Sequence, residues 1–153
     1  MANTTEVIER AQQLAKEKQE PALEVLLGML DEELTHHPEL KDQVSYEPQY
    51  KDGEMGSLDD LKFVGLRVLN RWNKELHALV CGNKPEDAAQ RNNFLASLSL
   101  GEAAVIGAVV TALLPLGVPP IVAAPLAAII VKRFIRSGKD EVCQVWAERI
   151  ARP

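Results

Sequence analysis

Histidine, cysteine and aromatic residues are all scarce in this sequence. Its 153 residues include three histidines, two cysteines and 5% aromatic residues. Two cysteines are too few for a disulfide framework, and Cys81 and Cys143 each lie among apolar residues in a predicted helix. We therefore expect both to be reduced thiols that behave as small hydrophobic side chains. With so few histidines and no clustering, acid–base or nucleophilic catalysis would have to depend on carboxylates alone.

Motifs for catalysis and metal binding are missing as well. The sequence has no phosphate-binding loop, no Gly-x-Ser-x-Gly and no His-Glu-x-x-His. Glu33 and His36 form half of a di-iron carboxylate motif, which needs a second Glu-x-x-His and two more glutamates. His77 and Cys81 are four residues apart on a helix, but no other Cys or His is near them in the sequence. We predict a non-enzyme with no cofactor and no metal site, and the sequence identifies no small-molecule substrate.

Charge is absent from one long segment. The 29 residues from 103 to 131 include no Asp, Glu, Lys or Arg. The net charge is −8 before this segment and +3 after it, which gives −5 for the chain. Because the chain is acidic and no basic patch stands out in the sequence, we predict no nucleic-acid partner. The N-terminus lacks the apolar run of a secretory signal, so we expect a cytoplasmic protein that is not secreted.

The rest of the chain has the apolar spacing of amphipathic helices and no convincing strand alternation. Cap residues followed three positions later by an acid predict helix starts at Ser57, Asn83, Ser99 and Ser137, and Thr4 or Thr5 can cap the first helix. The predicted fold is an all-α bundle of six or seven helices in one domain, residues 1–153. Its expected parts are an N-terminal helical pair (1–37), an exposed loop (38–56), amphipathic helices (57–98), an apolar hairpin (99–136) and a C-terminal amphipathic helix (137–153).

The loop at 38–56 has no helical periodicity and contains both tyrosines of the chain, Tyr46 and Tyr50. Its prolines, glycines and charged residues predict an exposed segment. The two tyrosines are candidate partner contacts, and the alternative is that they pack against the bundle.

The uncharged segment is too long to be one straight helix, and its prolines divide it. Pro115, Gly117, Pro119 and Pro120 predict a break between arms at about 100–114 and 120–136. The arms are apolar all round, so other helices or lipid must surround them. The hairpin residues are Val105, Ile106, Val109, Val110, Leu113, Leu114, Ile121, Val122, Leu126, Ile129, Ile130 and Val131. A basic flank follows at Lys132, Arg133, Arg136 and Lys139.

This hairpin supports two functional hypotheses. In the first, it anchors on or inserts into a membrane, the basic flank meets anionic lipid, and the acidic N-terminal part regulates the step. That arrangement resembles pore-forming helical domains with a central hydrophobic hairpin, in architecture only. In the second, the hairpin is the permanent core of a soluble interaction or adaptor module. Both hypotheses include a protein partner or self-association, and the first adds membrane lipid.

Overall fold

The computed structural model describes residues 3–50, 56–135 and 141–151. Within these ranges the chain is all-α, as predicted, with seven α-helices, two 3-10 helices and no strand. The elements are α1 (Thr4–Glu17), α2 (Glu20–His36), η1 (Pro38–Asp42), α3 (Leu58–Cys81), η2 (Pro85–Asp87), α4 (Ala88–Ser97), α5 (Glu102–Leu113), α6 (Pro120–Phe134) and α7 (Val142–Ala151).

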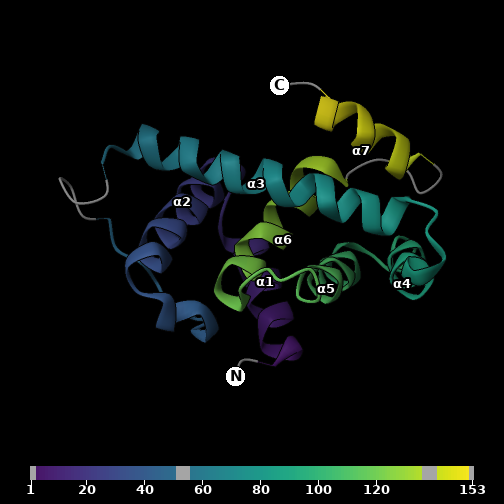
Figure 1. Cartoon of the computed structure of the whole chain (residues 1–153), viewed down its shortest axis with the longest axis horizontal. Helices are drawn as coiled ribbons and strands as arrows, with labels where there is room; N and C mark the ends of the chain where they lie inside the picture. The colour runs from purple at the N-terminus through teal and green to yellow at the C-terminus, as the bar shows by residue number, and fades with distance from the viewer. Residues whose placement is uncertain (1–2, 51–55, 136–140, 152–153) are drawn as a thin grey trace.

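Helix α3 crosses the whole molecule and organises the other helices (Figure 1). Its N-terminal half lies beside α2, and its C-terminal half contacts α4 and α7. Helix α6 lies beneath α3 in the middle of the fold, where it contacts α1, α2 and α5. The core is therefore built around α6, whose sequence has no polar side chain before Lys132.

Helix α3 begins where the sequence predicted. The Ser57 side chain accepts a hydrogen bond from the backbone N–H of Asp60, and the Asp60 carboxylate accepts one from the backbone N–H of Ser57. This reciprocal capping box satisfies donors that the first turn of a helix leaves unpaired. The helix then runs to Cys81, within the predicted amphipathic region 57–98.

Three other predicted caps are wrong in detail. The cap of α1 is Asn3, whose side chain accepts from the Glu6 N–H at 2.8 Å, in place of Thr4 or Thr5. Asn83 caps nothing, because the 3-10 turn η2 intervenes and α4 starts only at Ala88. Ser99 donates its hydroxyl to the Ala96 carbonyl, and Gly101 precedes α5. The predicted cap at Ser137 lies outside the described residues.

Two glycines allow α2 and α3 to approach very closely. A Cβ atom added to Gly65 would lie 1.9 Å from the Glu24 carbonyl oxygen, and one added to Gly28 would lie 1.9 Å from the Leu61 carbonyl oxygen. Both obstacles are backbone atoms, which cannot rotate away. Glycine is therefore required at this crossing because the two helix backbones are in direct contact.

The predicted exposed loop at 38–56 is more ordered than expected in its first part. Residues Pro38–Asp42 form η1, and Val44 is buried. Tyr46 packs against the core, and its hydroxyl donates to the buried carboxylate of Glu33. Tyr50 is more exposed and donates to the Gly56 carbonyl at 2.7 Å. Apolar anchors at Val44 and Tyr46 explain why this stretch follows the bundle without helical periodicity.

Candidate functional site

The predicted hairpin residues lie in the protein interior. Of the twelve, eleven are buried and Leu114 is half-buried. The arms are shorter than predicted, at 12 residues in α5 and 15 in α6. Among the helices that the structure describes, none is both long and apolar enough to cross a membrane.

The basic end of α6 is bonded to the N-terminal helices. Arg133 Nε lies 2.8 Å from Glu20 Oε1, and Arg133 Nη2 donates to Glu24 Oε1. Lys132 Nζ donates to the Lys18 carbonyl at 2.7 Å, and Lys62 Nζ is 3.6 Å from Glu24 Oε2. Of the predicted basic flank, Lys132 and Arg133 are therefore engaged inside the protein, and Arg136 and Lys139 lie outside the described residues.

The charge of Arg133 is stabilised by these contacts. Burial of the guanidinium lowers its pKa, but the hydrogen bonds and charges of Glu24 and Glu20 outweigh burial and raise the pKa above its ordinary value. Glu24 is buried, so its carboxylate needs this cation. Sequence patterns could not predict this cluster, because Arg133 and its partners Glu20 and Glu24 are more than 100 positions apart.

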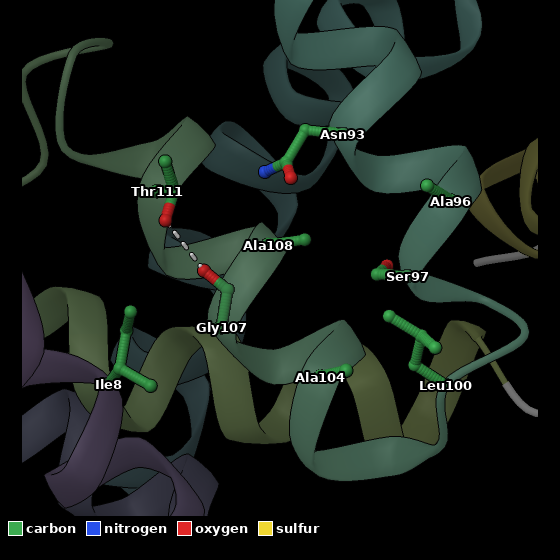
Figure 2. Close-up of a pocket in the computed structure, with 9 residues that line it drawn as sticks. All are labelled: Ile8, Asn93, Ala96, Ser97, Leu100, Ala104, Gly107, Ala108 and Thr111. Atoms are coloured by element: carbon green, nitrogen blue, oxygen red, sulfur yellow. Dashed lines mark hydrogen bonds between the residues drawn. The ribbon is translucent and has the colours of Figure 1, made fainter.

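A groove of about 290 Å³ lies between α4 and α5, with Ile8 of α1 at one side (Figure 2). Ala104, Gly107 and Ala108 line it from α5, and the exposed Leu100 stands at its edge. Its hydroxyl groups are already bonded, since Ser97 donates to the Phe94 carbonyl and Thr111 to the Gly107 carbonyl. No residue lining it is titratable, so the groove offers contact area and no acid–base chemistry.

Two adjoining grooves along α2 and α3 are more polar, and the larger is also bounded by Gly117, Pro119 and Val122. They share Asp31, Val68 and Arg71; the larger, about 370 Å³, is also lined by Leu34 and Trp72. The Arg71 guanidinium lies 4.7 Å from the centre of the Trp72 ring. Of the three grooves described, these two are the ones in which cations lie beside an apolar surface.

Asp31 in these grooves has a raised pKa. Burial is the main cause and Glu32 adds to it, while Arg67 and Arg71 oppose the shift. The folded protein thus binds the Asp31 proton more tightly than the unfolded chain does, so this group's stabilising contribution is full at low pH and is lost as the pH rises from 3.8 through the raised value. We expect Asp31→Asn to remove that loss and to be at least as stable as the wild type at neutral pH. Urea unfolding from pH 3 to pH 7 measures this as the stability of the variant minus that of the wild type, which should increase with pH, and a difference that does not change with pH would contradict it.

The prediction of reduced cysteines is wrong. Cys81 at the end of α3 and Cys143 in α7 form a disulfide, with their Cα atoms 5.6 Å apart. They are 62 positions apart in the sequence, and only the docking of α7 on α3 brings them together. Because Cys81 is bonded to Cys143, the pair His77 and Cys81 has no free thiolate for a metal.

The packing of α7 on the bundle is centred on Trp146, which is fully buried. Its indole N–H donates to Asn73 Oδ1 at 2.7 Å, and its ring packs edge-on against His77 and at a tilt against Phe94. His77 Nε2 also lies 2.9 Å from the Cys143 carbonyl oxygen. His77 is therefore part of a packing contact between α3 and α7.

The other half-motif also has a structural explanation. Glu33 points inward to Tyr46, and His36 is exposed, 3.9 Å from Glu32. No group of three or more His, Cys, Asp or Glu side chains that could hold a metal occurs in the described part of the chain.

Comparison with known proteins does not assign this chain to a family. No known protein family, curated protein or solved structure matches this chain. The functional assignment therefore depends on the geometry above.

Proposed function

We propose that this protein is a non-enzymatic all-α interaction module, which keeps α5 and α6 as a permanent core and contacts protein partners through its outer surface. The observation that carries this proposal is the bonding of the basic end of α6. A hairpin that enters a bilayer needs its basic flank free for lipid headgroups. Here Lys132 and Arg133 bind the backbone and carboxylates of the N-terminal helices.

Burial supports the same proposal. From Ile121 to Val131 every residue of α6 is buried, by α1, α2 and α5 among others. Releasing this helix would expose its side chains to water. This exposure would cost about 1.5–3 kcal/mol for each large apolar side chain, until contact with lipid replaced the lost burial. The surface grooves are open to partners without any such rearrangement.

Triggered membrane insertion is the second candidate, and one observation favours it. The basic end of α6 is held by ion pairs of Arg133 with Glu20 and Glu24. Under this alternative, loss of these ion pairs would free α6 for an anionic membrane.

Hydrogen exchange with and without phosphatidylserine vesicles separates the two candidates. We expect amides 105–131 to exchange slowly, at the rate of global unfolding, and to be unaffected by vesicles at neutral and acidic pH. Vesicle flotation and dye release should both be negative. Rapid exchange across 105–131, or faster exchange when vesicles are added, would refute a permanent core.

A variant in which uncharged glutamines replace Glu20 and Glu24 makes the test sharper. Glu20→Gln/Glu24→Gln should lower the free energy of unfolding by about 2 kcal/mol, because Arg133 loses two charged partners. It should still release no dye from vesicles. The matched control is Glu9→Gln/Glu75→Gln, which makes the same charge change at exposed positions. Dye release by the first variant alone would establish the membrane candidate instead.

A further inference from the structure

The outer face of α3 carries positive charge in an otherwise acidic protein. Residues 61–74 contain four basic residues and no acidic one. Lys62 is near Glu24, but Arg67, Arg71 and Lys74 are exposed and form no ion pair within the described residues. Their spacing of three and four places them on one side of the helix. We call Arg67, Arg71 and Lys74 the basic stripe.

Aromatic side chains accompany the stripe. The Arg67 guanidinium lies 5.6 Å from the centre of the Phe63 ring, and Phe63 is 63% exposed. The Arg71 guanidinium lies over Trp72, which lines the groove of about 370 Å³ with Leu34 and Val68. Stacking holds both guanidinium groups in place while leaving their N–H donors free for an anion. The stripe and the groove together form one surface with cations beside an apolar recess.

We propose that this surface binds an acidic segment of a partner protein that also carries an apolar anchor side chain. This proposal rests on the proposed function, because it names the chemistry of the partner. Carboxylates of the segment would pair with Arg67, Arg71 and Lys74, and the anchor would enter the groove against Trp72 and Leu34. Arginine accepts a carboxylate through two parallel hydrogen bonds, and buried apolar anchors supply most of the affinity at interfaces.

Charge favours this occupant over a nucleic acid. A nucleic acid presents a continuous line of phosphates, and three cations cannot offset its repulsion from a chain of net charge −5. A short acidic segment carries few charges, which can all lie over the stripe. The apolar recess beside Arg71 has no role in phosphate binding, but it matches a side chain of an amphipathic segment.

The test compares three fluorescent probes on the full chain: a random Glu/Tyr copolymer, polyglutamate of the same length, and a single-stranded DNA oligonucleotide. We expect the copolymer to bind most tightly, with an affinity that falls as salt increases. Arg67→Glu/Arg71→Glu should weaken it at least about tenfold. Asp31→Asn should strengthen it, because a carboxylate at the edge of the recess is removed.

The control variant is Lys16→Glu/Lys84→Glu, which makes the same charge change at exposed positions away from the stripe. Circular dichroism and thermal unfolding of each variant show that loss of binding is not loss of folding. Equal weakening by both double variants, or no copolymer binding, would overturn the proposal. DNA binding at least as tight as copolymer binding would assign the stripe to nucleic acid.

The remaining possible occupant of the surface is a second copy of this chain. Size-exclusion chromatography with light scattering tests this by measuring the oligomeric state. A dimer that Arg67→Glu/Arg71→Glu dissociates would assign the surface to a second copy of this chain and overturn a separate partner. These results are independent of the vesicle experiments. The stripe can bind the copolymer even if α6 proves able to enter lipid, and a permanently buried α6 does not require a working stripe.

Discussion

Gly65→Ala is expected to lower the free energy of unfolding by about 3 kcal/mol or more. The new methyl group would lie 1.9 Å from the Glu24 carbonyl oxygen, so α2 and α3 would have to separate along their whole contact. Gly28→Ala should have a similar effect for the same reason at the Leu61 carbonyl. Urea unfolding followed by circular dichroism measures both.

Gly107→Ala is the matched control, because the same substitution should have the opposite sign there. Gly107 lies within α5, and an added Cβ would be 3.6 Å from the Ile8 Cγ2 atom, an ordinary contact. Alanine is the better helix former by about 1 kcal/mol, so this variant should be slightly more stable than the wild type. Equal stabilities of Gly65→Ala and Gly107→Ala would contradict the close approach of α2 and α3.

Loss of the disulfide is expected to have the largest effect on stability. Cys81 and Cys143 close a loop of 62 residues, for which the chain-entropy relation gives about 4 kcal/mol. Cys81→Ala/Cys143→Ala should therefore unfold at much lower urea. Without the crosslink, α7 depends mainly on the contacts of Trp146, so amides 142–150 should exchange faster than those of α6.

A reducing agent provides the control for this prediction. It should lower the stability of the wild type by the same amount and leave the alanine variant unchanged. Thiol titration of the unreduced, denatured wild type should find no free thiol, and two thiols would contradict the crosslink. Disulfides persist in oxidising compartments and are rare in the cytosol, so in a reducing compartment the protein would be less stable by about this energy.

Several features could be predicted because their causes are local. The cap of α3 depends on Ser57 and Asp60, three positions apart, and the two apolar helices follow from the uncharged segment and its prolines. The predicted cap at Ser99 is wrong because the Ser99 hydroxyl donates to the Ala96 carbonyl in the preceding turn. A serine side chain can bond to backbone groups on either side of it, and the sequence does not show which bond forms.

The proposed binding surface does not stand out as a basic patch in the sequence. The sequence shows that residues 61–74 contain basic residues and no acidic one. Whether these cations are available to a partner depends on which groups of the folded protein lie next to each of them. Folding places Lys62 near Glu24 and leaves Arg67 and Arg71 beside adjoining grooves that α2, α3 and the start of α6 form together. Helical periodicity gives the side of a helix on which a residue lies, and it does not show whether a partner faces it.

The sequence alone determined that this protein is all-α, and it located the two apolar helices, because periodicity, capping and proline breaks act within a few residues. The tertiary structure decided what surrounds those helices, where the basic end of α6 is bonded, and that Cys81 meets Cys143. The disulfide and the bonds of the Lys132 and Arg133 side chains join residues 62 to 114 positions apart. Such pairs form only when helices pack, and packing depends on the shape of all the faces at once.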